Sequence, residues 1–462
     1  MRNIVKHPSL FFIILLLFCL ARPVHAQEEY IRHQVQSLET FYSLSVKYHV
    51  TIDEIKAANP GVAMPRTGEY LNIPVKIEDG SVDKGKECAK LKKSRNQVYQ
   101  VALLIPLYLE QTIDSGWADN IDASQARDFP PFRFIQFYDG FMLAADSMQQ
   151  QGMNVKIYVY DVDQQSSKVN HVLADPEFRK MDLIVGPFLK NSFAEVSEFA
   201  KENHIPIVNP LSQRRDILTG NPYVFKIIPS PESQPASLGK LVKRDFSDFN
   251  VILYTANKYQ STDLVDQIRE SVQGALSSGS PPIKTIDYAS DSIKGFLQYA
   301  SETRQNLIIV YSEGEAFPMA LVSKLSAVKS NYPVTVIGMP EWEKFSILES
   351  SYLLNLNTHI FAAAYVDYDS EDVKGLIRRY RSDYMDEPLS YAFTGFSAGY
   401  FFLQALFQYG DDFIGCIDNV KVSLPQNQFY FEKQGDGGYD NVNWNIMQYY
   451  DYRLVDRSVS WK

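Results

Sequence analysis

The chain has 462 residues, with 45 Lys and Arg against 55 Asp and Glu, so its formal net charge is −10. This length allows more than one globular domain, and 45% hydrophobic with 22% charged residues is typical of globular proteins, not of disordered or fibrous ones. The acidic balance argues against nucleic acids and anionic membrane surfaces as partners. Seven His and three Cys leave little material for metal or thiol chemistry.

Residues 1–26 have the pattern of a secretory signal peptide. A positively charged start precedes an apolar run over residues 10–20, and a small-x-small cleavage site ends at Ala26. The apolar run is shorter than the roughly 20 residues that a membrane helix needs. A lipid anchor on Cys19 is the alternative, but bulky Phe18 before it argues against lipidation. We therefore expect an exported protein of the periplasm or cell envelope.

Export places the mature chain in an oxidising compartment, where Cys88 and Cys416 are the cysteines that remain. A disulfide between them would tie the region before residue 98 to the C-terminal region. Two unpaired, partly buried thiols fit the sequence equally well, because sequence does not give the separation of the two residues.

Residues 33–76 predict a small module in the order strand, helix, helix, strand. The first strand begins at His33, the second helix begins near Thr51, and a second strand covers Tyr70–Pro74. The segment contains the short motifs His33-x-Val35, Glu39-Thr40, Tyr48-x-Val50-Thr51, Ile55, Asn59-Pro60 and Gly68-Glu69-x-Leu71-x-Ile73-Pro74. In these motifs it resembles a LysM module, a glycan-binding domain. One departure is Ser37-Leu38, where the family usually has Gly.

The LysM resemblance implies binding of chains that contain N-acetylglucosamine, which makes peptidoglycan the expected partner. The family's groove lies between two loops, and its contacts carry over to Leu38, Glu39, Thr40, Asn59, Pro60 and Gly61. The alternative is that Asn59-Pro60-Gly61 only ends the second helix.

Residues 77–97 form a linker of mixed charge, and from residue 98 onward apolar runs alternate with amphipathic stretches. The expected strands cover residues 99–104, 155–160, 182–185, 205–208, 251–254, 307–311 and 334–337. The expected helices cover residues 134–150, 192–203, 235–246, 261–272, 293–302 and 316–330. Such alternation predicts an α/β fold with parallel sheets covered on both faces, and two sheets fit the number of strands better than one.

The region from Tyr99 to the C-terminus contains five distinctive motifs. These are Tyr138-Asp139-Gly140-Phe141, Asp182-Leu183-Ile184-Val185-Gly186-Pro187, Ile205-Pro206-Ile207-Val208-Asn209-Pro210, Tyr223-Val224-Phe225-Lys226-Ile227 and Glu387-Pro388-x-x-Tyr391-Ala392-Phe393-x-Gly395-Phe396-Ser397-Ala398. In these motifs the region resembles the type I periplasmic-binding fold, the two-lobed architecture of solute receptors for amino acids and related ligands. The resemblance implies lobe 1 over about residues 98–228 and 361–420, and lobe 2 over about residues 229–360 and 421–462. Two departures are Ser397, where the family often has Asp, and a polar insertion over residues 110–131.

Ligands of open parallel sheets bind at the carboxyl ends of the strands, so the same places are the candidate ligand cleft here. In lobe 1 these are Gly186, Asn191, Ser192, Asn209 and Ser212, whose turns lead into helices and suit an anionic group. Tyr254, Tyr311 and Tyr365 follow strands of lobe 2 or its junction and could stack on a ligand. Ordinary turn and core-edge packing is the alternative for each residue.

No pattern marks an enzyme, because the sequence lacks HxH, HExxH and paired Cys–His spacings. Gly435-Asp436-Gly437-Gly438 lacks the Lys of a phosphate loop and fits a hairpin turn better. We expect no catalytic residues, no metal and no cofactor. Two hypotheses remain: a wall-anchored scaffold or regulator of peptidoglycan machinery, such as a synthase, and a wall-tethered receptor for an amino acid or muropeptide-like ligand. Tethering, the insertion and Ser397 favour the scaffold.

Overall fold

The computed structural model describes residues 30–35, 41, 44, 52–62, 64–74, 88, 97–110, 130–255, 262–312, 314–345, 349–426 and 428–458. The expected signal peptide, the expected glycan contacts Leu38, Glu39 and Thr40, and most of the linker and of the insertion lie outside these residues. The chain divides into two compact units, Met1–Lys90 and Leu91–Lys462.

The first unit contains two antiparallel strands, β1 (Tyr30–Gln34) and β2 (Tyr70–Pro74), with α3 (Ile52–Ala58) between them in sequence. Side chains alternate along β2, so that Leu71 and Ile73 are fully buried while their neighbours face out. The small core is made of Val35, Phe41, Leu44, Ile55, Leu71 and Ile73. The second predicted strand is confirmed, and β1 begins three residues earlier than expected.

Asn59 ties the end of α3 to β2. Its Nδ2 donates to the backbone oxygens of Ile55 and Asn72, each at 2.7 Å, and its Oδ1 accepts from the Asn72 N–H at 2.8 Å. Pro60 and Gly61, which follow it, are exposed, and Gly61 has a φ of +97°. The side chain of Asn59 is therefore a structural clamp, whereas the two residues after it are accessible.

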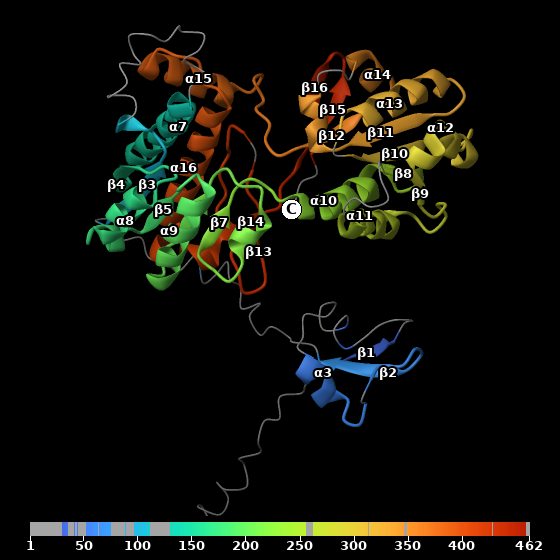
Figure 1. Ribbon diagram of the computed structural model, residues 1–462, viewed down its shortest axis with the longest axis horizontal. Helices are drawn as coiled ribbons and strands as arrows, with labels where there is room; N and C mark the ends of the chain where they lie inside the picture. Colours follow the sequence, from blue (N-terminus) through green and yellow to red (C-terminus); the bar gives the residue numbers. More distant parts are fainter. Residues whose placement is uncertain are drawn as a thin grey trace, which may run out of the picture. The chain divides into compact units, whose positions relative to one another are not determined.

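The second unit contains two lobes, each built on a seven-stranded sheet (Figure 1). The lobe 1 sheet has the order β13 (Phe431–Lys433), β14 (Tyr439–Asn441), β7 (Val224–Lys226), β6 (Ile207–Asn209), β5 (Leu183–Val185), β3 (Val98–Ile105), β4 (Asn154–Asp161). The lobe 2 sheet has the order β16 (Arg453–Asp456), β15 (Asn445–Tyr450), β12 (His359–Ala362), β11 (Val334–Gly338), β10 (Asn306–Tyr311), β8 (Asn250–Thr255), β9 (Lys284–Asp287).

Helices cover both sheets. Lobe 1 contains α7 (Pro130–Gln150), α8 (Ser166–Ala174), α9 (Lys190–Glu202), α15 (Glu371–Tyr384) and α16 (Ser390–Tyr409). Lobe 2 contains α10 (Gln234–Leu241), α11 (Thr262–Ala275), α12 (Tyr288–Tyr299), α13 (Ala316–Val328) and α14 (Ser350–Asn355). Shorter helical turns are η2 (Phe178–Lys180), η3 (Arg215–Leu218), η4 (Pro231–Ser233), η5 (Val242–Phe246), η6 (Pro340–Lys344) and η7 (Gly410–Asn419).

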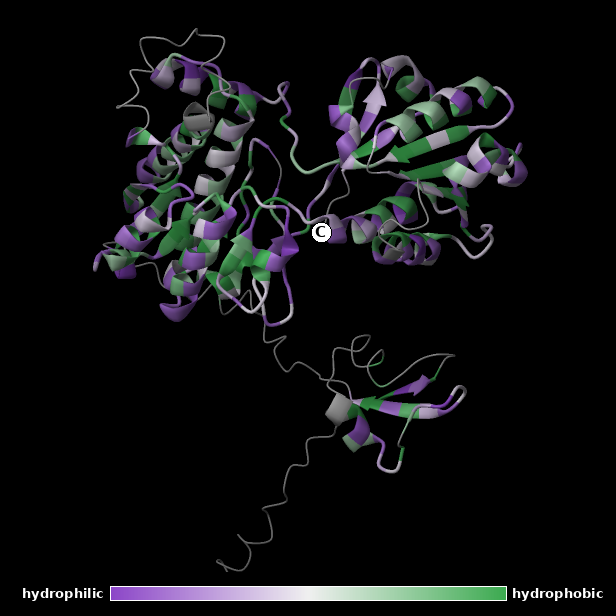
Figure 2. Ribbon diagram, in the orientation of Figure 1, coloured by the Kyte–Doolittle hydropathy of each residue, from purple (hydrophilic) through white to green (hydrophobic). Residues whose placement is uncertain are grey.

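The predicted two-sheet α/β fold is confirmed. Each of the seven predicted strands overlaps an observed one, and the core strands pair in parallel. Strands such as β8 and β11 are buried along their whole length because helices shield both faces, which explains their continuous apolar sequences (Figure 2). The predicted hairpin at Gly435–Gly438 joins antiparallel strands β13 and β14.

Within the described residues the chain passes between the lobes three times, at residues 227–233, 363–370 and 442–444. The predicted lobe boundaries were wrong at two places. Residues 431–441 form β13 and β14 in lobe 1, not lobe 2, because β14 pairs in parallel with β7, and Leu424 and Phe429 before them also pack in the lobe 1 core. Residues 361–362 belong to β12 in lobe 2, because β12 pairs with β11 and β15.

The core of lobe 1 depends on a close crossing of α7 and α16, which lie side by side although some 250 residues separate them (Figure 1). Two glycines permit the approach. A Cβ on Gly140 would lie 2.0 Å from the backbone oxygen of Ala392, and one on Gly395 would lie 2.1 Å from that of Phe137. Any larger residue at either place would force the helices apart.

Candidate functional site

A cavity of about 630 Å³ lies in lobe 2 at the carboxyl ends of β10 and β11. Tyr311 ends β10 there and Ser312 follows it, Met339 and Glu341 follow β11, and α11 contributes Asp263. The described lining is completed by Pro231, Glu232, Gln234, Leu264 and Gln267. Strand ends are the expected place for a ligand in an open parallel sheet. Of the three predicted tyrosines, Tyr311 is the one in this cavity.

The cavity is acidic. Its described lining contains the carboxylates of Glu232, Asp263 and Glu341 but no Lys or Arg side chain. Buried Met339 supplies an apolar wall. Gln234, Gln267 and Tyr311 add amide and hydroxyl groups that can hydrogen-bond a ligand. Such a lining suits a small molecule with a cationic group such as an amine, because the opposite charges attract.

The strand ends of lobe 1 are occupied by contacts within the chain. The Asp161 carboxylate, at the end of β4, accepts from the backbone N–H groups of Leu107, Tyr108 and Leu109 at 2.8–3.0 Å. Lys168 lies 3.3 Å from Asp161 and 3.0 Å from Asp163. These contacts hold the residues after β3 against β4, at the point where the insertion begins.

The predicted ligand residues of lobe 1 use their side chains to shape loops. Ser192 is buried and donates to the backbone oxygen of Asp163. Asn209 accepts from the N–H groups of Leu211 and Ser212 at 3.1 and 2.7 Å. The Ser212 hydroxyl in turn accepts from the Arg214 N–H at 3.1 Å. These bonds are the ordinary turn chemistry that the sequence left as the alternative.

The remaining two predicted residues of lobe 1 differ in exposure. Gly186 is buried with a φ of +87° before a cis peptide bond to Pro187, and a Cβ there would lie 2.1 Å from the Leu104 backbone oxygen. Asn191, one turn further on, is exposed in α9. Close packing therefore accounts for Gly186, and a ligand role for Asn191 stays a prediction.

Tyr254 does not fit the predicted cleft role. Its side chain is fully buried, and its hydroxyl donates to the Ser292 backbone oxygen at 2.8 Å. Burial raises the pKa of Tyr254 above its ordinary value. The residue lies in β8 and points into the helix layer against Tyr288 and Phe317, because side chains of a strand alternate between the two faces of the sheet.

Tyr365 lines a different cavity, of about 410 Å³, at the second passage between the lobes. This cavity includes Asp367, Asp369 and Asp372 from the start of α15 and its approach, and Arg453 and Asp456 from β16. Tyr311 and Tyr365 therefore do not meet in one site.

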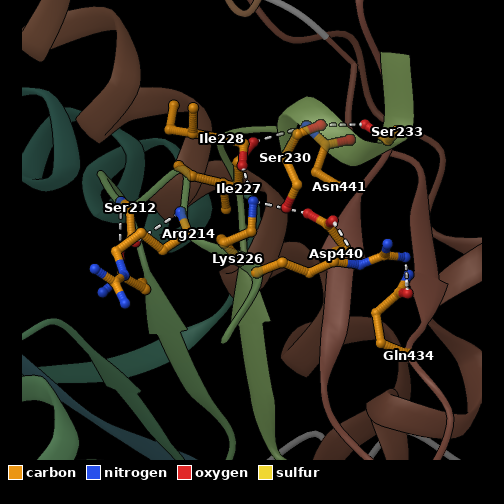
Figure 3. A network of polar contacts seen from close by, with 12 residues as sticks. Ser212, Arg214, Lys226, Ile227, Ile228, Ser230, Ser233, Gln434, Asp440 and Asn441 are labelled. Carbon is orange, nitrogen blue, oxygen red and sulfur yellow. Dashed lines mark hydrogen bonds and ion pairs between the residues drawn. The ribbon is translucent and has the colours of Figure 1, made fainter. Parts of the chain in front are cut away.

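A buried ion pair lies where two strands of lobe 1 lead toward lobe 2. Lys226 in β7 and Asp440 in β14 face each other in register, with Nζ 2.8 Å from Oδ1 and both side chains fully buried (Figure 3). Burial lowers the pKa of Lys226, and the Asp440 carboxylate partly offsets that effect. This pair was not predicted from the sequence, although a lysine inside the apolar run Tyr223-Val224-Phe225-Lys226-Ile227 is itself an indication of a buried charge.

The cavity carboxylates Glu232, Asp263 and Glu341 were not predicted from the sequence, because the prediction for lobe 2 rested on aromatic side chains after its strands. Among the described residues, no group of three or more His, Cys, Asp or Glu could hold a metal ion. In the same part of the chain, no helix is long and apolar enough to cross a membrane.

A protein-family model described as periplasmic binding protein matches residues 134–415, which is more than half of the chain. The chain belongs to the periplasmic binding protein family. This confirms the large periplasmic-binding-like domain that the sequence predicted, and members of the family are periplasmic and are not enzymes. A comparison with curated proteins finds no match.

Solved structures share the fold. A putative branched-chain amino acid ABC transporter protein from Rhodospirillum rubrum is 12% identical, with a TM-score of 0.53 over 79% of this chain and 100% of that one. An ABC-type branched-chain amino acid transporter protein from Rhodopseudomonas palustris is 13% identical, with a TM-score of 0.50 over 78% of this chain and 95% of that one. At such identities the likeness concerns the fold alone.

Proposed function

We propose that the protein is an exported solute receptor whose lobe 2 cavity binds a small molecule with a free amino group, such as an amino acid or a muropeptide. The observation that carries the proposal is the 630 Å³ cavity at the ends of β10 and β11, with three carboxylates and no basic side chain in its described lining. The names of the structural relatives, which are amino acid transporter proteins, agree with this ligand class. A membrane transporter that accepts the solute is then the expected partner.

The receptor replaces the scaffold as the favoured hypothesis. Ser397 had counted for the scaffold, but it is fully buried in α16 within lobe 1 and so carries no information about the cleft. The insertion lies largely outside the described residues. Family membership and the acidic cavity both favour solute binding.

A thermal-shift panel tests the receptor. Amino acids, amines and wall peptides are compared with their N-acetylated forms, which lack the positive charge. A ligand at one hundred times its dissociation constant stabilises the fold by about 2.7 kcal/mol. We expect free amines to stabilise the protein and the N-acetylated forms to have no effect.

Two carboxylates on the same helix provide a matched pair of variants. Both side chains are exposed, but Asp263→Asn removes a charge that lines the cavity, whereas Asp266→Asn removes one that lies outside it and is paired with Arg269. Losing one hydrogen bond to a charged group costs about 1.5–3 kcal/mol, or roughly a tenfold to hundredfold weaker affinity. Equal affinity in both variants, or binding of N-acetylated ligands alone, contradicts the proposal. No binding across the panel returns the scaffold to first place.

For the first unit we propose peptidoglycan binding through its LysM-like module. The strand order, the pairing of β1 with β2 and the exposure of Pro60 and Gly61 support this proposal. The full chain should sediment with insoluble peptidoglycan. Pro60→Ala should reduce the bound fraction, whereas Met64→Ala, at an exposed position outside the predicted groove, should not. Sedimentation no greater than that of a protein without such a module contradicts the proposal.

A further inference from the structure

Two of the three passages between the lobes run beside each other, because β7 and β14, which lead into them, are neighbours in the lobe 1 sheet. The first passage covers residues 227–233, and the third covers residues 442–444. Polar side chains of these two segments and of the strand ends just before them form links at three successive levels. The first level is the ion pair of Lys226 and Asp440 at the end of the sheet (Figure 3).

The second level is Asn441. Its Nδ2 donates to the Ile227 backbone oxygen at 2.7 Å, and its Oδ1 accepts from the N–H groups of Tyr430 and Asn443 at 3.0 and 3.1 Å. One buried amide thus connects the start of the first passage to the start of the third.

The third level lies at the entry to lobe 2. The Trp444 indole Nε1 donates to the Ser233 hydroxyl at 2.8 Å, and this hydroxyl donates to the Ser230 backbone oxygen at 2.7 Å. The Trp444 ring also packs edge-on against Phe361 of β12, with centroids 6.2 Å apart. The two passages are therefore joined at both ends and fixed to both lobes.

The second passage differs in its environment. Its residues 363–370 are all partly or fully exposed, whereas residues 442–444 and most of residues 227–233 are buried. Hydrogen bonds between buried groups are stronger than those exposed to water, and breaking one leaves a costly unpaired group. Movement of one lobe relative to the other deforms all three passages. The joined pair has buried hydrogen bonds to lose, whereas the exposed passage has few buried contacts, so the joined pair resists the movement more.

We propose that residues 227–233 and 442–444 form a two-stranded hinge ribbon whose polar links limit how far the lobes separate. Breaking one link lets the two passages bend independently, so the lobes sample a wider range of distances. The proposal concerns the ligand-free protein and does not depend on the identity of the solute.

Pulsed electron-spin distance measurements on the full chain, without ligand, test this proposal. Spin labels are attached at Lys201→Cys in lobe 1 and Glu270→Cys in lobe 2, both exposed helix positions. Cys88 and Cys416 are disulfide-bonded and do not take up the label. The link is broken by Trp444→Phe, which keeps an aromatic ring but lacks the N–H donor, and separately by Ser233→Ala.

Trp342→Phe is the matched control. Trp342 is also buried in lobe 2, but its Nε1 has no hydrogen-bond partner within the described part of the chain. We expect both link variants to broaden the distance distribution and to shift its mean to longer distances, while the control retains the wild-type distribution. Circular dichroism confirms that each variant is folded. Wild-type distributions in both link variants, or equal broadening in the control, would overturn the proposal.

Discussion

Replacing either member of the buried pair Lys226–Asp440 should destabilise the fold, with opposite dependence on pH for the two variants. In Lys226→Met the Asp440 carboxylate is buried without its cation, and the next basic group, Arg215 Nε, is 4.0 Å away. The folded variant must then either keep an unpaired buried charge or take up a proton. Removing one partner of a buried pair typically costs about 3–5 kcal/mol.

Proton uptake sets an upper limit on that cost. An ordinary aspartic acid has a pKa of about 3.9, and each pH unit above it costs about 1.4 kcal/mol, so protonation costs about 4 kcal/mol at pH 7 and about 1.5 kcal/mol at pH 5. Lys226→Met should therefore regain stability as the pH falls. The carboxylate left without its cation binds a proton more tightly in the folded variant than in the unfolded one, so a lower pH favours the folded state.

Asp440→Asn should behave in the opposite way. It leaves the Lys226 ammonium buried, and an ordinary lysine with a pKa of about 10.4 loses its proton at a cost of about 4.6 kcal/mol at pH 7 and about 2 kcal/mol at pH 9. This variant should therefore regain stability as the pH rises. Burial already lowers the pKa of Lys226 in the intact pair, which agrees with that direction.

Urea unfolding at pH 5, 7 and 9 measures both effects against the wild type. The double variant Lys226→Met/Asp440→Leu should recover most of the loss, since an apolar pair of similar size has no charge to desolvate. A loss below about 1 kcal/mol at pH 7 in both single variants, or the same pH trend in both, would refute the reasoning.

Three further predictions concern other parts of the chain. Burial raises the pKa of Asp139 to about 6, although the Tyr380 hydroxyl donates to it at 3.0 Å. The protonated Asp139 carboxyl therefore contributes to stability fully below about pH 4, and this contribution is lost as the pH rises through 6. In melting temperatures measured across this pH range, Asp139→Asn should remove the loss. Asn59→Ala should destabilise the first unit by about 1–3 kcal/mol, because it leaves buried backbone groups unpaired. Thermal unfolding measures this loss, and an unchanged unfolding transition contradicts the structural role of the Asn59 side chain. Cys88 and Cys416 are each disulfide-bonded, so non-reducing peptide mapping should recover a linked peptide that contains both, and recovery of either cysteine in another linkage or as a free thiol contradicts a bond between them.

The apolar runs were sufficient to predict the central strands. Segments such as Leu307–Tyr311 and Val334–Ile337 are buried on both faces, so their sequences are continuously apolar and distinct from the helices beside them. Edge strand β4 was predicted, but the edge strands β9, β13 and β16 were not. Lys284–Asp287 is partly exposed and polar, and nothing in its local sequence indicates that it pairs with β8.

The lobe assignment of the C-terminal region failed for a related reason. Tyr439–Asn441 joins lobe 1 through its pairing with β7, a contact between residues more than 200 positions apart, and local patterns contain no information about such a partner. Of the three tyrosines predicted at strand ends, Tyr311 lines the lobe 2 cavity, and its role in binding stays a prediction. The rule of strand ends does not reveal which side chains face a cavity and which, like Tyr254, point into the core.

The close crossing of α7 and α16 determines when lobe 1 can be completed during synthesis. Gly140 is made early, but its partners Ala392 and Phe396 are made only after the whole central portion of lobe 2. Strand β14 follows later still, and β15 then completes the sheet of lobe 2. Neither lobe can close its core before the last tenth of the chain has been synthesised. A C-terminal truncation should therefore expose apolar surface in both lobes at once, and the two lobes should depend on chaperones until the final residues emerge.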